Sequence, residues 1–456
     1  MVAREDGQEV SGTAAIPFVR KAETLFDTSD ISREKYFNFF KEDVMKKFLA
    51  TLLAIVSVLA LSACGKDDGL TMWCIATKSD SNRHSYEAAI ADMQKKYPDT
   101  KLNWEAYENN AYKEKIKAAV SGNNMPDIFF TWSCAFLGDF VKEDKVYCLD
   151  EAYADFKDKL PEKMCKNTTY NGKKYGVPLT MNIVGLFANM DILKEVGYDD
   201  VPKTFEDLMT CCEKIKAAGK IPFGCAGKPD DTWCVTEYLE SIIEKSVGAK
   251  TLDDIFMNGQ TWDNQDVAKA VDLFQEMIKK GYFDPNGISL GNDEVKQNFM
   301  DGKYAFYMNG TWNCADFAKK EGLNVKVAEF PVINADKAEL GQLIGGPSDT
   351  LAVAKSAKNA KETAKYTFEL GQLICKYGYL DGCGLPAWTV DYDVSKINAL
   401  TQSVAKIVAD SNYMVLFGDT AMPAAEAGKY LEQVKGVYGC TVDGATFIAN
   451  LKKDIR

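Results

Sequence analysis

The residue types that usually carry enzyme chemistry are sparse in this sequence. It contains one histidine, His84, among 456 residues, so a Ser-His-Asp triad has a single candidate base and a histidine-rich metal site cannot form. The cysteines include no C-x-x-C pair, and there is no G-x-x-x-x-G-K-[ST] phosphate loop and no G-x-S-x-G nucleophile turn. We therefore expect no catalytic residue, no metal site and no cofactor.

Pairs of acidic residues leave one enzymatic alternative open. Glu105 with Glu108, or Asp230 with Asp231, are candidates for the two carboxylates of a glycoside hydrolase. The chain has 66 acidic residues, so such pairs arise by chance, and a solvated surface explains them more simply. A secreted glycoside-acting enzyme remains the alternative reading.

Tryptophans that follow strands indicate binding instead. Trp132 comes directly after the predicted strand 127–131, and Trp312 follows the predicted strand 304–308 and a three-residue turn. Ligands of α/β sheets bind beyond the carboxyl ends of strands, and an indole offers a flat apolar face that suits a sugar ring. Trp233, in a loop-like stretch, is a third candidate.

The elements that must position these rings alternate between strand and helix. Apolar or alternating runs predict strands at 70–76, 101–107 and 127–130, separated by helical spacing at 85–95 and 112–120. Further helices are predicted at 204–215, with Thr204 as N-cap, at 264–280 and at 360–377. Strands are predicted at 304–308, 325–330 and 351–354. This order predicts an α/β fold with mostly parallel sheets flanked by helices.

The N-terminal region contains an export signal that begins at Met45 rather than at Met1. A short basic start is followed by a 14-residue apolar stretch, 48–61, which is too short to span a bilayer. It ends in Leu-Ser-Ala before Cys64 and resembles the lipobox of bacterial lipoproteins. We expect 1–44 to be a mis-assigned upstream extension, 45–63 a signal peptide, Cys64 the lipid anchor and 64–69 a tether.

The charge of the chain argues against a nucleic-acid partner, and its composition indicates a globular fold. The formal net charge is −12, from 54 basic and 66 acidic residues, which works against nucleic-acid binding because that needs a basic surface. With 46% hydrophobic and 26% charged residues, the composition is typical of a globular protein.

Several motifs, in their order along the chain, resemble one known family. Lys95-Lys96-Tyr97-Pro98 is followed by Pro126-Asp127-Ile128-Phe129 and then by the run 171–178, NGKKYGVP. The most specific piece is residues 299–312, FMDGKYAFYMNGTW. Together they are similar to the extracellular solute-binding proteins of carbohydrate ABC transporters, the group that contains maltose-binding protein. The likeness covers nearly all of 70–456.

The resemblance implies a two-lobe periplasmic-binding-protein-like fold of type II, hinged by crossing segments near 178–186, 329–333 and 384–387. We accordingly expect 70–180 plus 331–385 to form the N-terminal lobe, and 181–330 plus 386–456 to form the C-terminal lobe.

The resemblance also implies which residues contact the ligand. Trp132 and Trp312 would be stacking platforms. The full set of expected ligand-binding residues is Ser79, Asp80, Trp132, Asn182, Trp233, Asn309, Trp312 and Gly346. No basic residue stands after the third strand, where some members of the family have one.

The function implied is binding without chemistry. The protein would be an extracytoplasmic monomer, lipid-anchored to the outer face of the bacterial cell membrane. It would hold a mono- or oligosaccharide between two lobes and pass it to the transmembrane subunits of an ABC permease. A solute-binding protein for a peptide or a polyamine is a further alternative, although a cationic ligand would need an acid cluster beside aromatic rings.

Overall fold

The computed structural model describes residues 69–455. The expected upstream extension, the signal peptide, Cys64 and the tether up to residue 68 lie outside the described residues. None of the helices within 69–455 combines the length and the apolar character that a membrane span requires.

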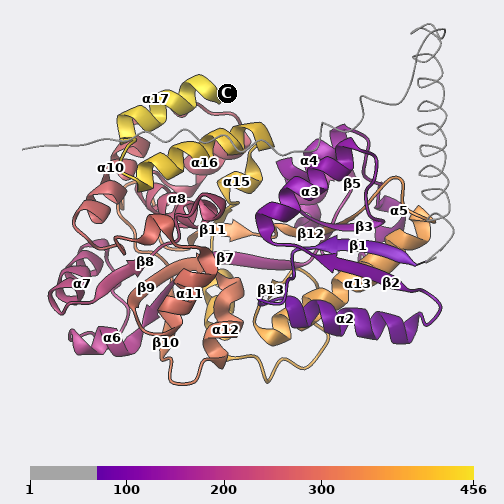
Figure 1. Cartoon of the computed structure of the whole chain (residues 1–456), viewed down its shortest axis with the longest axis horizontal. Coiled ribbons are helices and arrows are strands. Elements are labelled where there is room, and N and C mark those ends of the chain that lie inside the picture. The colour runs from indigo at the N-terminus through magenta and orange to yellow at the C-terminus, as the bar shows by residue number, and fades with distance from the viewer. Residues whose placement is uncertain (1–68, 456) are drawn as a thin grey trace, which may run out of the picture. The chain divides into compact units, whose positions relative to one another are not determined.

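A five-stranded sheet, in the order β2-β1-β3-β12-β6, organises the first lobe (Figure 1). Its opening confirms the predicted strand–helix alternation, because β1 pairs in parallel with both β2 and β3. The strands are β1 (Leu70–Cys74), β2 (Leu102–Ala106), β3 (Ile128–Trp132), β6 (Val177–Pro178) and β12 (Asp349–Val353). The helices are α2 (Arg83–Lys96), α3 (Asn109–Ser121), α4 (Ala135–Lys142), α5 (Asp150–Tyr153) and α13 (Ala360–Asp381). A small hairpin pairs β4 (Thr169–Tyr170) with β5 (Lys173–Lys174).

A seven-stranded sheet organises the second lobe around one long strand, β7 (Thr180–Asn189), all ten of whose residues are buried. It pairs antiparallel with each of its neighbours. The remaining strands are β8 (Ile221–Gly224), β9 (Tyr304–Gly310), β10 (Val325–Ala328), β11 (Gln342–Gly346), β13 (Leu385–Pro386) and β14 (Tyr413–Val415). The sheets are therefore mixed rather than mostly parallel, because β7 and β12 run against their neighbours.

Helices cover the second sheet. They are α6 (Met190–Glu195), α7 (Phe205–Ala217), α8 (Trp233–Val247), α9 (Ala249–Met257), α10 (Gln265–Lys279), α11 (Asn292–Met300), α12 (Cys314–Lys319), α14 (Ala399–Ala409), α15 (Gly418–Ala421), α16 (Ala424–Tyr438) and α17 (Gly444–Asp454). Thr204 caps α7 as predicted, since its side chain accepts a hydrogen bond from the Asp207 N–H (3.1 Å). Two short 3-10 turns matter for the site, Pro229–Asp231 and Thr311–Asn313.

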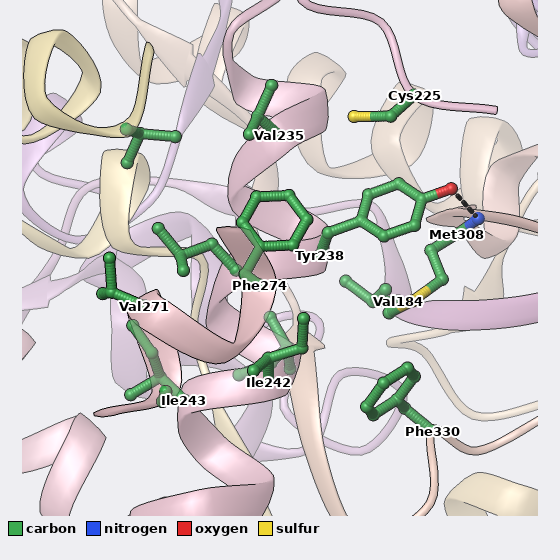
Figure 2. Packing of buried hydrophobic residues seen from close by; sticks show 14 of the residues in the cluster. Val184, Cys225, Val235, Tyr238, Ile242, Ile243, Val271, Phe274, Met308 and Phe330 are labelled. Carbon is green, nitrogen blue, oxygen red and sulfur yellow. Dashed lines mark hydrogen bonds between the residues drawn. The ribbon is translucent and has the colours of Figure 1, made fainter. Parts of the chain in front are cut away.

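Helix α8 fixes the core of the second lobe. Ile242, Ile243 and Tyr238 pack among side chains from α10 and β9 (Figure 2). The buried Tyr238 hydroxyl accepts a hydrogen bond from the Met308 N–H of β9 (2.9 Å), so a polar contact registers the helix on the sheet (Figure 2). A separate apolar cluster, which includes Phe129 and Leu351, fills the first lobe.

Three segments cross between the two sheets, and one of them differs from the expectation. The chain crosses between β6 and β7 and again around β13, as expected near 178–186 and 384–387. The segment 329–333 does not cross, because β10 and β11 on either side of it both pair with β7. The third crossing lies instead at Pro347 and Ser348, between β11 and β12. Residues 331–346 therefore belong with the second sheet and not with the N-terminal lobe.

The two-lobe α/β architecture itself is confirmed. Each lobe has its own sheet, and Trp388, just after β13, is buried in the first-lobe cluster, where its Nε1 donates to the Pro178 carbonyl (2.8 Å). The crossing strands thus connect two separately packed cores, and several backbone links rather than one linker hold the lobes together.

Candidate functional site

A cavity of about 480 Å³ opens between the two lobes. One wall comes from the ends of β1, β3 and β12 and from α3, and the other from α8, α11, α15 and the turn Thr311–Asn313. Five of the expected residues line it: Ser79, Asp80, Trp132, Trp233 and Trp312. The volume lies in the range of small-molecule sites.

Trp132 is the aromatic residue of the first wall. It is the last residue of β3 and is half-buried. Phe130 and Phe136 pack edge-to-face with its ring, at centroid distances of 5.0 and 5.2 Å. Lys113 Nζ lies 4.7 Å from the ring centroid. The ring is therefore held in place by its neighbours, and one position over it is taken by a cation.

Trp312 is one of three aromatic residues that pack together in the second wall. Its ring centroid lies 5.9 Å from that of Trp233 and 6.3 Å from that of Phe417. The indole lies directly on the backbone of Gly310, where a β-carbon would overlap the six-membered ring. Glycine at 310 is thus required for this ring position, because any side chain would displace the ring.

Three expected residues, Asn182, Asn309 and Gly346, do not line the cavity, and the two asparagines instead accept hydrogen bonds from the turn that carries Trp312. Asn182 Oδ1 accepts a hydrogen bond from the Thr311 hydroxyl (3.1 Å). Asn309 Oδ1 accepts from the Gly310 N–H and from Asn313 Nδ2, both at 2.9 Å. Gly346 pairs with Asn182 across β11 and β7. Both asparagines are buried, at 3% and 0% exposure, so their side-chain oxygens form hydrogen bonds inside the protein.

Two carboxyl groups of the first wall have displaced pKa values. Desolvation by burial raises the pKa of Asp80 to about 6, although the Asn82 N–H donates to it and opposes the shift (2.8 Å). Burial raises the pKa of Asp349 to about 7, and the nearby negative charge of Asp80 adds to the effect. Near neutral pH this wall therefore offers partly protonated carboxyls that can accept or donate hydrogen bonds.

The second wall contains two further acids. Burial raises the pKa of Asp231, whose carboxylate accepts the Asn292 N–H (3.0 Å). Burial raises the pKa of the Glu237 carboxyl well above its ordinary value, and the charges of Glu240 and Asp419 act in the same direction. The lining side chains include eight acids but only three lysines, Lys113, Lys228 and Lys296. The cavity is thus acidic and aromatic.

Two contacts bridge the lobes at the edge of the cavity. Lys113 Nζ of α3 lies 3.6 Å from Asp419 Oδ2 of α15. The Asn110 amide of α3 donates to the Asp230 carbonyl in the 3-10 turn before α8. Because Lys113 also lies over Trp132, a sugar that stacks on that face must displace its ammonium group.

Local sequence contains no direct signal that Lys113, Asp349, Phe417 or Asp419 would line the cavity. Glu237 had no distinguishing signal either, because α8 also contains Glu240, Glu244 and Lys245. His84 lies outside the cavity lining, and its Nδ1 bonds Asp381 Oδ2 (2.7 Å). Residues 69–455 contain no group of three or more His, Cys, Asp or Glu side chains arranged to hold a metal ion.

Comparison with known proteins also relates this chain to solute-binding proteins. Residues 79–367 match the family model described as bacterial extracellular solute-binding protein. The multiple sugar-binding protein of Streptococcus mutans is 21% identical over 384 residues, which is 81% of this chain and 88% of that protein.

Solved structures agree in fold. One, described under xylan utilization by the thermophilic bacterium Caldanaerobius polysaccharolyticus, superposes with a TM-score of 0.81 at 29% identity, covering 85% of this chain and 100% of the other. A chitin oligosaccharide binding protein superposes with a TM-score of 0.77 at 19% identity, covering 84% and 97% of the two chains. Together with the family match, these similarities confirm the expected type II two-lobe fold.

Proposed function

The chain belongs to the family of bacterial extracellular solute-binding proteins, and from this premise we propose that it captures an oligosaccharide between its lobes and delivers it to an ABC importer. The observation that carries the proposal is the placement of Trp132 on one wall and of Trp312 with Trp233 on the other wall of a single cavity. Flat apolar faces beside acids and amides are what a sugar requires, since its rings have apolar faces and its edges carry hydroxyls.

Binding is proposed to involve no covalent step. A sugar that contacts Trp132 and Trp312 together favours the state in which the lobes are close, because it gains contacts with both only there. The crossing segments at β6–β7, at 347–348 and at β13 are the places where the chain can bend. The permease subunits would then bind the closed form.

The printed names of the relatives suggest which sugars to try first. One similar protein binds multiple sugars, one similar structure comes from work on xylan utilization, and another binds chitin oligosaccharides. A thermal-shift screen would therefore compare xylotriose, maltotriose and triacetylchitotriose with tripeptides and with spermidine. We expect a neutral oligosaccharide to raise the melting temperature, because it binds only the folded state. A response to peptides or spermidine alone would contradict the proposal.

The enzymatic alternative is tested in the same tubes. After incubation each oligosaccharide is analysed by chromatography, and we expect it to be recovered intact. Shortened products that vanish when the protein is omitted would show a glycoside-acting enzyme instead.

We also propose that the protein is a monomer anchored on the outer face of the membrane through lipid on Cys64. The support for the anchor is the sequence alone, in which a basic start, an apolar stretch and Leu61-Ser62-Ala63 precede this cysteine. An anchor raises the effective concentration of the protein at the permease. Cys64→Ser is expected to release the protein from the membrane fraction into the medium, and retention of this variant at the membrane would contradict the lipid anchor.

A further inference from the structure

A buried acid that has no well-formed hydrogen bond with the described residues lies in the second wall of the cavity. Glu237 stands on α8 one turn after Trp233, so both side chains lie on the same face of the helix. The residue is 1% exposed, yet it contributes to the cavity lining. Neither of its carboxyl oxygens has a hydrogen-bond partner among the described residues. Buried polar groups in folded proteins are rarely left in this state.

The neighbouring groups do not satisfy Glu237, because they are engaged elsewhere. The Gly310 N–H donates to Asn309 Oδ1 (2.9 Å), and its weaker interaction with the Glu237 carboxyl lowers the pKa of that carboxyl only in part against the effect of burial. Glu240, one turn further along α8, accepts from the Gly418 N–H (3.1 Å) and the Tyr430 hydroxyl (3.0 Å). Asp419 is paired with Lys113. The nearby hydrogen-bond donors thus bind other acceptors, and Glu237 faces the cavity.

The same neighbours determine the charge of Glu237. Burial opposes the ionised form, and the carboxylates of Glu240 and Asp419 oppose it further, so the pKa lies well above its ordinary value. A protonated carboxyl has one O–H donor and one carbonyl acceptor. Two neighbouring hydroxyls of a sugar can meet both, one as acceptor and the other as donor.

The Trp233 indole supports the same reading. Its Nε1 is buried and makes no hydrogen bond of good geometry with the described residues, and only a weaker interaction with the Asp231 carboxyl lowers the pKa of that acid. Trp233 also lines the cavity. A donor and an acid that the described residues leave without a well-formed hydrogen bond therefore stand one helical turn apart on the same wall, and the Trp233 ring lies beside that of Trp312. A ligand with an apolar ring face and polar edges satisfies all three.

We propose that Glu237 is a specificity-determining residue, whose uncharged carboxyl donates to one hydroxyl of the bound sugar and accepts from the adjacent one. This inference rests on the proposed function and names the part of the ligand that the site selects, a pair of vicinal hydroxyls on an uncharged sugar. A sugar lacking either hydroxyl leaves the buried carboxyl unpaired in the complex, which disfavours binding.

The test uses calorimetric titration with whichever of xylotriose, maltotriose and triacetylchitotriose binds the wild-type protein most tightly. Glu237→Leu is expected to weaken binding by about 10- to 100-fold, the effect of losing hydrogen bonds to a desolvated group. Glu237→Gln, which keeps a neutral donor and acceptor, is expected to recover most of that loss. Glu244→Gln is the matched control, because Glu244 is also buried on α8 but does not line the cavity, and its affinity should equal that of the wild type.

Folding and binding are separated by a second measurement. Because Glu237→Leu removes an unpaired buried acid, its melting temperature without sugar should equal or exceed that of the wild type. Mono-deoxy analogues of the same trisaccharide complete the test. We expect one vicinal pair of deletions to weaken binding to the wild type about tenfold or more and to have little further effect in Glu237→Leu.

Each outcome decides something. Unchanged affinity in a folded Glu237→Leu overturns the inference while leaving the proposed function intact. Equal losses in Glu237→Leu and Glu237→Gln also overturn it, because they would show that the ionised carboxylate is the binding form. A wild-type protein that binds none of the three trisaccharides contradicts the proposed function, and the inference falls with it.

Discussion

The exposed face of Trp312 allows a quantitative prediction. The indole lies on Gly310 on one side, and the rings of Trp233 and Phe417 pack against it at interplanar angles of 55° and 53°, so we take one face as available to a ligand. A buried tryptophan covers roughly 150–250 Å², and one face is about a third of that, ~50–80 Å². At ~25 cal/mol per Å² of apolar surface, covering this face contributes about 1.3–2 kcal/mol, or ~8- to 30-fold in affinity.

Trp312→Ala is therefore expected to weaken the binding of the best trisaccharide by about this factor. The assay is isothermal titration of the purified variant, with its melting temperature measured in parallel. Trp104→Leu is the control, because Trp104 is half-buried on β2 beneath the Arg83 guanidinium (4.3 Å) and does not line the cavity. A folded Trp312→Ala protein that binds within twofold of the wild type would refute stacking on this ring.

Three further predictions follow from the cavity. Gly310→Ala places a methyl group where the indole of Trp312 lies, so the ring must move and affinity should fall about tenfold with unchanged far-UV circular dichroism. The pKa of Asp349 is raised from an ordinary 3.8 to about 7. Between these two pH values the folded state therefore keeps a proton on Asp349 that the unfolded state has lost. Its contribution to stability is complete below pH 4 and is lost as pH rises to 7, so the wild-type melting temperature should fall by roughly 2 °C or more between pH 5 and 8, and that of Asp349→Asn should fall less. A sugar carrying a uronic acid should bind about tenfold or more weakly than its neutral counterpart, because eight acids and three lysines line the site.

Each of these predictions has a contradicting result. Wild-type affinity in Gly310→Ala would mean that the observed ring position is not needed for binding. Parallel pH profiles for Asp349→Asn and the wild type would show that Asp349 titrates normally in the folded protein. Equal affinity for a neutral sugar and its uronate, at low and at moderate salt, would show that the acids do not control which ligands enter.

Local pattern was sufficient to predict the opening of the first lobe, from β1 to β3 with α2 and α3 between them. The β3 run Ile-Phe-Phe-Thr-Trp is apolar enough to be buried, and helical spacing predicted α2 and α3 within a few residues. The lobe boundary could not be predicted in the same way. Whether β11 pairs with β7 or joins the first sheet depends on contacts between residues about 160 positions apart, such as Asn182 and Gly346. The local sequence of 329–346 contains no signal for that choice.

The candidate site also contains residues that local pattern predicted and residues that only long-range contacts bring together. The rule that ligands bind beyond strand ends located Trp132 and Trp312, because it depends only on recognising β3 and β9. Asn182 and Asn309 are polar residues in apolar strands, and sequence alone does not distinguish a ligand contact from a structural role at such positions. In the structure both accept hydrogen bonds from the turn that carries Trp312. Glu237, Lys113 and Asp419 meet at the cavity only when α8, α3 and α15 come together, and no local pattern encodes that meeting.

The most direct test of the central claim is a crystal structure of the protein with its tightest-binding oligosaccharide. We predict an intact sugar in the cavity between the lobes, with ring faces in van der Waals contact with both Trp132 and Trp312. A sugar bound elsewhere, or one that contacts only a single lobe, would contradict capture between two walls.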